Sequence, residues 1–118
     1  MYGVPEALKL DAFLNEEIIV VHLGIHIFQL IFSNNLSISC EGKVEVIENG
    51  VSTTIRNKDW ENLNPLISIQ YKPIVGCKIE SKKSFSLTLS DKIKIIFTDN
   101  SEKYESLQIR IGEEFWVI

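Results

Sequence analysis

The sequence predicts a mainly β fold, a β-rich α+β architecture of two pseudo-repeated antiparallel β-meanders that share one core, with one or two short helices. Three observations predict it. An alternating apolar and polar pattern occurs twice, at 18–41 and 75–98, and the two copies align without a gap. Isoleucine is abundant and alanine scarce, which favours strands over helices. Asn-Gly and related turn dipeptides separate the alternating runs.

The two copies match on one face of their strands. Side chains alternate across a strand, so even-numbered residues of the first copy and odd-numbered residues of the second share that face. The face is apolar in both copies. Its most closely matched pairs are Phe28 with Phe85, Leu30 with Leu87 and Ile38 with Ile95. We therefore expect these six residues in one core.

Each element follows from a local pattern. Pro5 opens a short helix or turn over 5–14, where Leu8, Phe13 and Leu14 lie near helical spacing. A second short helix is expected over 59–66, with Asp59 as its cap. The alternating runs predict strands at 17–24, 26–33, 36–41, 44–48, 51–56, 75–81, 84–90, 92–98, 107–111 and 114–118.

The turns between these strands also have sequence signals. Asn34-Asn35 and Asp91-Lys92 occupy the same place in the two copies, and Asn tolerates the left-handed conformation of a tight turn. Asn49-Gly50 is the strongest hairpin signal in the chain. With 118 residues and no linker, the chain is expected to form one domain over 1–118, with repeat units at about 14–48 and 71–111.

Charge and hydropathy exclude several classes of protein. A net charge of −4 argues against a nucleic-acid binder, whose affinity depends on clustered Lys and Arg. The longest apolar run, 18–32, is interrupted by polar residues and by Gly24, so no membrane span is expected. Glu6, Lys9 and Asp11 stand where a signal peptide needs an apolar core. The chain is therefore expected to be cytoplasmic.

No catalytic set or cofactor motif emerges from the residues. His22, His26 and Cys40 could be proposed as zinc ligands, but positions i and i+4 of a strand lie roughly 13 Å apart. Cys40 and Cys77 follow core-facing residues, which predicts buried, reduced and dispensable thiols. Asp99 begins an acidic turn in which solvated charge is expected. We therefore predict a non-enzyme with no catalytic residue, metal or cofactor.

The opposite face of the first copy is unusually apolar. It carries a predicted stripe that is the candidate interface: Ile19, Val21, Leu23, Ile25 and Ile31. Large exposed apolar patches are uncommon on monomers and mark binding sites. An intramolecular alternative stays open, in which the helices at 5–14 and 59–66 cover this face with Leu8, Phe13, Trp60 and Leu63.

Two patterns also resemble a known family. One is Phe-x-Leu-x-Phe-Ser-Asn-x-Leu-x-Ile-x-x-Glu at 28–41, with its echo at 85–98, and the other is Tyr104-Glu105-Ser106 before the last strands. Together they resemble a family of uncharacterised small bacterial two-repeat β proteins, over roughly 10–118. The resemblance implies an immunity-like protein, akin to those that neutralise polymorphic toxins, and it transfers no functional residue. The Ile-rich first strands depart from the family pattern.

The leading functional expectation is a non-enzymatic protein-binding module that captures a toxin or enzyme, or pairs with itself as a homodimer. One rival is a small-molecule-binding β module with a pocket lined by His22, Trp60 and Tyr71. Another is a homo-oligomeric structural protein. An enzyme that uses His22 or the acidic turn is ranked last. Nucleic acid and membranes are not expected as partners.

Overall fold

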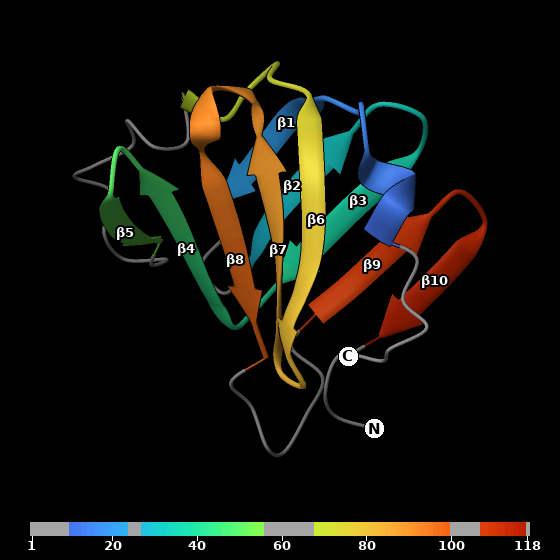
Figure 1. Cartoon of the computed structure of the whole chain (residues 1–118). Helices are drawn as coiled ribbons and strands as arrows, with labels where there is room; N and C mark the ends of the chain where they lie inside the picture. Colours follow the sequence, from blue (N-terminus) through green and yellow to red (C-terminus); the bar gives the residue numbers. More distant parts are fainter. Residues whose placement is uncertain (1–9, 24–26, 56–67, 100–106, 118) are drawn as a thin grey trace.

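The computed structural model describes residues 10–23, 27–55, 68–99 and 107–117. Two antiparallel sheets face each other, and each is made of five strands (Figure 1). Sheet 1 has the strand order β1-β2-β3-β9-β10, and sheet 2 has the order β5-β4-β8-β7-β6. The predicted mainly β fold with two meanders is confirmed.

All the predicted strands are present, with ends that shift by no more than a few residues. They are β1 (Ile18–Leu23), β2 (Phe28–Phe32), β3 (Leu36–Cys40), β4 (Lys43–Glu48), β5 (Val51–Ile55), β6 (Ile74–Ser81), β7 (Ser84–Leu89), β8 (Lys94–Thr98), β9 (Leu107–Ile111) and β10 (Glu114–Val117). Two short 3-10 helices accompany them, η1 (Leu10–Phe13) and η2 (Ser90–Lys92). The predicted helix at 59–66 and residues 5–9 lie outside the described residues.

The two repeats exchange their hairpins. The first meander, β1-β2-β3, is followed by the hairpin β4-β5, which pairs through β4 with β8 in sheet 2. The second meander, β6-β7-β8, is followed by the hairpin β9-β10, which pairs through β9 with β3 in sheet 1. Each sheet therefore combines a meander from one repeat with a hairpin from the other.

The hairpins are equivalent in register, so the repeat extends past the predicted units into β5 and β10. Val44 of β4 lies opposite Phe97, and Leu107 of β9 lies opposite Cys40, the repeat equivalent of Phe97. Each hairpin turns through two residues, Asn49-Gly50 in the first and Gly112-Glu113 in the second. The connection between the third strand and the hairpin is longer in the second repeat.

The first strands differ from the ungapped alignment by one residue. Leu23 lies opposite Phe28, and Ile79 lies opposite Phe85, so Leu23 and not His22 is equivalent to Ile79. Each of these strands also carries a β-bulge at the same place, between Ile18 and Val20 in β1 and between Ile74 and Gly76 in β6. The bulges reverse the inward and outward positions within each strand.

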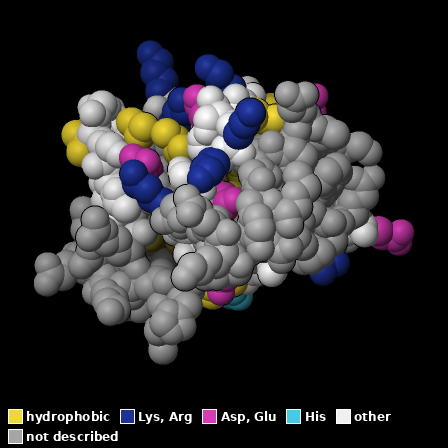
Figure 2. All heavy atoms as spheres, turned by 90° about the horizontal axis from the view of Figure 1, so that it is seen from below, with side chains coloured by type: hydrophobic (Ala, Val, Ile, Leu, Met, Phe, Trp, Pro, Cys, Tyr) yellow, Lys and Arg dark blue, Asp and Glu magenta, His cyan; other side chains and the backbone are white. Residues whose placement is uncertain are grey.

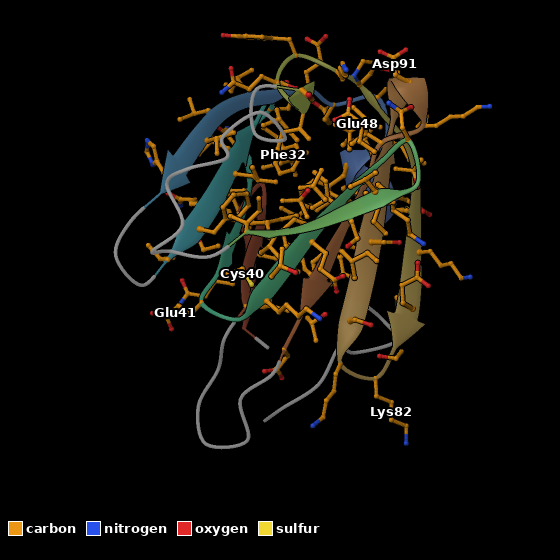
Figure 3. The ribbon with its side chains drawn as sticks, turned by 90° about the vertical axis from the view of Figure 1, so that its left-hand side faces the viewer. Phe32, Cys40, Glu41, Glu48, Lys82 and Asp91 are labelled. Carbon is orange, nitrogen blue, oxygen red and sulfur yellow. The ribbon has the colours of Figure 1, made fainter. Side chains whose placement is uncertain are left out.

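The core lies between the sheets, as Figure 3 shows for the side chains around Phe32. The six predicted core residues, Phe28, Leu30, Ile38, Phe85, Leu87 and Ile95, are all buried in one cluster, which confirms that prediction. η1 contributes Leu10 and Phe13 to this cluster, and the Phe13 ring meets Phe32 edge to face at 4.9 Å between ring centroids.

Candidate binding surface

The predicted apolar stripe is divided by the β1 bulge. Ile19 is 42% exposed, whereas Val21 lies opposite Leu30 and packs against the core. Ile31 is half-buried and lies opposite Val20, on the outer face of sheet 1. The prediction of one contiguous face is therefore wrong at Val21, because the extra residue of the bulge turns its side chain inward. The side chain of Leu23 and all of Ile25 lie outside the described part of the structure.

The described part of the first predicted helix does not lie over this face. η1 runs beside β6 (Figure 1), and it inserts Leu10 and Phe13 into the core between the sheets. These two residues therefore stabilise the interior. Phe13 therefore does not cover the apolar stripe, as the intramolecular alternative required.

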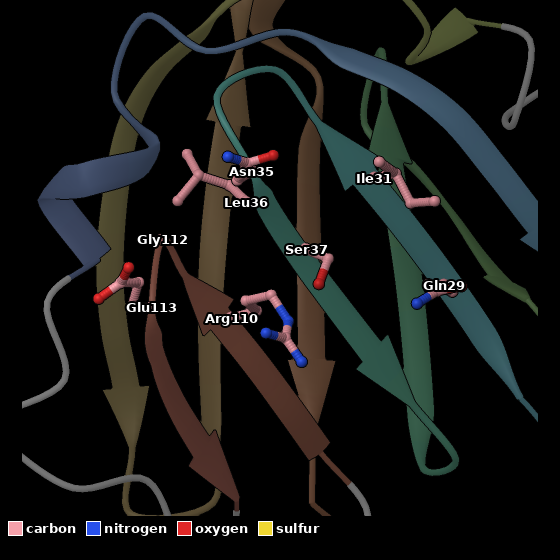
Figure 4. Close-up of a pocket in the computed structure, with 8 residues that line it drawn as sticks. All are labelled: Gln29, Ile31, Asn35, Leu36, Ser37, Arg110, Gly112 and Glu113. Carbon is pink, nitrogen blue, oxygen red and sulfur yellow. The ribbon is translucent and has the colours of Figure 1, made fainter.

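A depression of about 510 Å³ opens on the outer face of sheet 1 (Figure 4). β2, β3 and β9 contribute to its lining together with the turns that join β2 to β3 and β9 to β10. The lining residues are Gln29, Ile31, Asn35, Leu36, Ser37, Arg110, Gly112 and Glu113. Both repeats contribute to the depression, since β9 and its turn belong to the second repeat and the other elements belong to the first.

The exchange of hairpins creates this depression. β9 pairs with β3, which places Arg110 directly opposite Ser37 in the ladder. At the rim, the backbone N–H of Gly112 donates a hydrogen bond of 3.3 Å to the carbonyl oxygen of Asn35. Both residues have a positive φ, 61° at each. Two tight turns that are distant in the sequence are thereby held side by side.

Polar groups lie beside Ile31 and its cross-strand neighbour Val20 on this face. His22 Nδ1 lies 3.1 Å from Gln29 Oε1, so these two side chains are hydrogen-bonded across β1 and β2. Ser37 is half-buried, and Arg110 is exposed. The face therefore offers a guanidinium, amides and a hydroxyl beside the apolar side chains of Ile31 and Val20, a mixture found at protein interfaces.

On the outer face of sheet 2, charged side chains pair around Glu80. Glu80 accepts from Ser86 Oγ at 2.7 Å and lies 2.7 Å from Lys94 Nζ and 3.9 Å from Lys78 Nζ. The hydrogen bonds from Lys94 and Ser86 hold the pKa of Glu80 below its usual range. Figure 2, which views the molecule from below relative to Figure 1, also shows basic and acidic side chains interspersed.

The two thiols are free, but they differ in burial. Cys40 is buried, and burial is the main cause that raises the pKa of its thiol to about 12. Cys77 is only half-buried, so the prediction of burial is wrong for it. Burial and the carboxylate of Asp11, 3.5 Å from Cys77 Sγ, raise the pKa of this thiol too. Both groups are thiols and not thiolates at neutral pH.

Asp99 also departs from expectation, since it is buried and not solvated. It follows β8 directly, and its backbone N–H donates to the carbonyl oxygen of Lys83 at 2.7 Å. This bond continues the pairing of β7 with β8 by one residue and fixes Asp99 at the end of the central strand of sheet 2. Cys40 lies close enough for the Asp99 charge to contribute to its raised pKa.

The pocket that the sequence suggested for a small molecule is not assembled from its described members. The Tyr71 N–H bonds to the Ile18 carbonyl oxygen, whereas His22 lies four residues further along β1, at roughly 13 Å. Trp60 and His26 lie outside the described residues.

Within the described ranges, no three His, Cys, Asp or Glu side chains gather as a metal site would require. No helix there is long and apolar enough to cross a membrane.

Comparisons with protein-family models, with curated proteins and with solved structures give no match to this chain.

Proposed function

We propose that this chain is a cytoplasmic, non-enzymatic binding module, of the immunity-like kind, that uses the outer face of sheet 1 to neutralise a partner toxin or enzyme. The observation that carries the proposal is the open depression around Ile31 and Arg110. Strands from both repeats build it, and it combines an apolar side chain with hydrogen-bond donors.

Such a surface suits protein recognition for physical reasons. Arg is enriched among the residues that dominate binding energies, because it combines an apolar stem with a planar, multidentate head. Arg110, Ser37 and Gln29 stand on paired strands, which hold them in fixed relative positions. Neutralising an enzyme needs a complementary surface that blocks access, and no catalytic group is required.

The ion pair between Lys94 and Glu80 makes the outer face of sheet 2 a less favourable site for a partner. A partner that displaced Lys94 from Glu80 would have to break the 2.7 Å ion pair before gaining any contact. The hydroxyl of Ser86 is occupied by the same carboxylate. On sheet 1, Arg110 is exposed at the depression, and a guanidinium carries five N–H donors.

Site-specific photo-crosslinking in cells of the source organism tests the proposal. A photoreactive amino acid replaces Ile31 in one variant and Thr88, its repeat equivalent on sheet 2, in another. We expect a specific protein adduct from position 31 and none from position 88. Mass spectrometry then identifies the partner, and its activity is measured with and without the purified chain.

Stoichiometric inhibition of that partner by the unmodified protein would support the proposal. Arg110→Glu should abolish inhibition, and Lys82→Glu, an exposed change in the turn between β6 and β7, should leave it intact. Adducts formed only from position 88, or inhibition that survives Arg110→Glu, would overturn the assignment to sheet 1.

A small-molecule ligand is a second candidate, favoured by one observation. The depression, at about 510 Å³, falls within the range of known ligand pockets. Native mass spectrometry of protein purified from its source would detect a bound compound. Release of that compound by Arg110→Glu, together with the absence of a protein adduct from position 31, would favour this candidate over a protein partner.

A further inference from the structure

Within the described residues, β5 is an edge strand whose own sequence lacks three common devices against pairing. Among the strands that the structure describes, it pairs only with β4, at the end of sheet 2. Its sequence, Val51-Ser52-Thr53-Thr54-Ile55, contains no charge and no proline, and its register with β4 has no bulge. Natural edge strands commonly carry one of these devices to prevent association. Val51 is also 65% exposed, a value that only Tyr71 equals among the large apolar residues that the structure describes.

The hairpin geometry shows which backbone groups of β5 point away from β4. Asn49 and Gly50 have φ of 54° and 78°, as a two-residue primed turn requires. Such a turn makes Glu48 and Val51 a hydrogen-bonded pair, and bonded and non-bonded pairs then alternate along the ladder. Val51, Thr53 and Ile55 therefore bond to β4. The N–H and C=O groups of Ser52 and Thr54 point outward, at the free edge.

We infer that this edge pairs with the β5 strand of a second copy, antiparallel and about a two-fold axis through Thr53. In this register Ser52 of one copy faces Thr54 of the other. Their outward N–H and C=O groups then bond to one another on both sides of the axis. The pairing continues sheet 2 across the two molecules.

The side chains of β5 are self-complementary in the same register. The strand reads apolar, hydroxyl, threonine, hydroxyl, apolar from either end, so Val51 of one copy meets Ile55 of the other. Thr53 meets its own equivalent, and neither pairing opposes like charges. A second copy therefore supplies an apolar neighbour for Val51, which lines a small hollow with Val46, Glu48, Asn49 and Thr53.

The edges of β1 and β6 suit such pairing less well. β1 has a bulge between Ile18 and Val20, and β6 has two register shifts, at Ile74/Gly76 and Ile79/Ser81. Bulges twist an edge and interrupt the row of outward groups. β6 also carries Lys78 and Glu80, and a charge would be placed in any strand-to-strand contact there.

Sedimentation velocity of the full chain over a wide concentration range tests the inference. We expect a monomer–dimer equilibrium in the unmodified protein. Thr54→Pro removes an outward N–H from each copy without touching the bonds to β4, and should weaken the dimer about 10- to 100-fold. Thr54→Ala, which keeps the N–H, is the matched control and should dimerise almost as the unmodified protein does.

Charge reversal at the axis gives an independent test. Thr53→Lys and Thr53→Glu should each be monomeric, because like charges meet at the axis. An equimolar mixture should recover a heterodimer. Far-ultraviolet circular dichroism confirms that each variant is folded; if either is not, the Thr54→Pro and Thr54→Ala pair decides alone. A monomeric unmodified protein, or a dimer that survives Thr54→Pro, would overturn the inference. So would β5-dependent binding of a different protein by a monomer.

Discussion

Glu17 and Pro73, which occupy equivalent positions before the first strands of the two repeats, face each other across an isolated antiparallel bridge. Pro73 has no N–H, so the neighbours supply the hydrogen bonds. The Asn15 N–H donates to the Ile74 carbonyl oxygen at 2.8 Å, and the Tyr71 N–H donates to the Ile18 carbonyl oxygen at 2.9 Å. Each bond is the repeat equivalent of the other.

A side-chain contact beside this bridge is repeated with different chemistry. Asn34 Nδ2 donates to Glu16 at 2.9 Å in the first repeat, where Ser33 Oγ also donates to the carboxylate. In the second repeat the equivalent positions are Lys72 and Asp91, which form an ion pair at 3.3 Å. Both contacts join the residue before the first strand of a repeat to the turn after its second strand. The carboxylate lies before the first strand in the first repeat and in the turn in the second repeat.

Leu30→Ala and Leu87→Ala should destabilise the protein by similar amounts. Both side chains are fully buried at equivalent positions, and each truncation leaves a cavity that costs about 2–5 kcal/mol. Urea denaturation followed by circular dichroism measures the free energy of unfolding. A cost below about 1 kcal/mol at one position only would show that the two positions are not equivalent in packing.

Val21→Glu should be far more damaging than Ile19→Glu. Val21 packs against the core after the β1 bulge, so a carboxylate there loses water without gaining a partner. Ile19 is 42% exposed, and its replacement should change the free energy of unfolding by about 0.5 kcal/mol or less. Thermal melts of the two variants provide the comparison. Equal loss in both would mean that the bulge does not invert the strand.

Cys77 should react with a chromogenic thiol reagent before Cys40 does. Cys77 is half-buried, whereas the buried thiol of Cys40 has a pKa of about 12 and is almost entirely protonated at pH 8. The reaction should be slower than that of a free cysteine, because the pKa of Cys77 is raised too. Cys77→Ser should eliminate the faster phase of the reaction. If the faster phase remains in that variant, Cys40 is the more reactive thiol and the prediction is wrong.

Glu80→Gln should reduce the acid sensitivity of the fold. The pKa of Glu80 is lowered in the folded protein by Lys94 and Ser86. Its contribution to stability is therefore present above the unfolded pKa of about 4.5 and is lost as the pH falls through the lower folded pKa. At pH 7 the variant should lose no more than about 1 kcal/mol. Free energies of unfolding between pH 7 and pH 3 should fall less steeply for the variant than for the unmodified protein.

Sequence reasoning succeeds here where the signal is local. Alternation and the Asn-Gly dipeptide predict the strands and the β4-β5 hairpin, because side-chain direction and turn conformation depend on neighbouring residues. The exchange of hairpins has no such signal, since pairing between β3 and β9 depends on contacts across most of the chain. The ungapped match of the two copies also hides the one-residue offset between their first strands, β1 and β6.

The candidate site was only partly predictable for the same reason. Ile31 could be recognised by its place in an apolar stripe, whereas Arg110 becomes part of the site only because β9 lies beside β3. Val21 was misplaced because a bulge leaves no clear mark in a sequence. A polar turn predicts exposure of Asp99, whereas its backbone bond to Lys83 depends on the pairing of β7 with β8, which has no local signal in the sequence.

The exchange of hairpins also has a consequence for how the protein comes apart. Neither half of the chain can complete a sheet alone, because two of the five strands in each sheet belong to the other half. If the meander β1-β2-β3 unfolds, the hairpin β9-β10 of the other half loses the strand with which it pairs. In the same way, unfolding of β6-β7-β8 leaves the hairpin β4-β5 without its neighbour β8. Unfolding of either half therefore removes contacts from both sheets. For this reason the chain should melt in one cooperative transition, although its sequence consists of two tandem units.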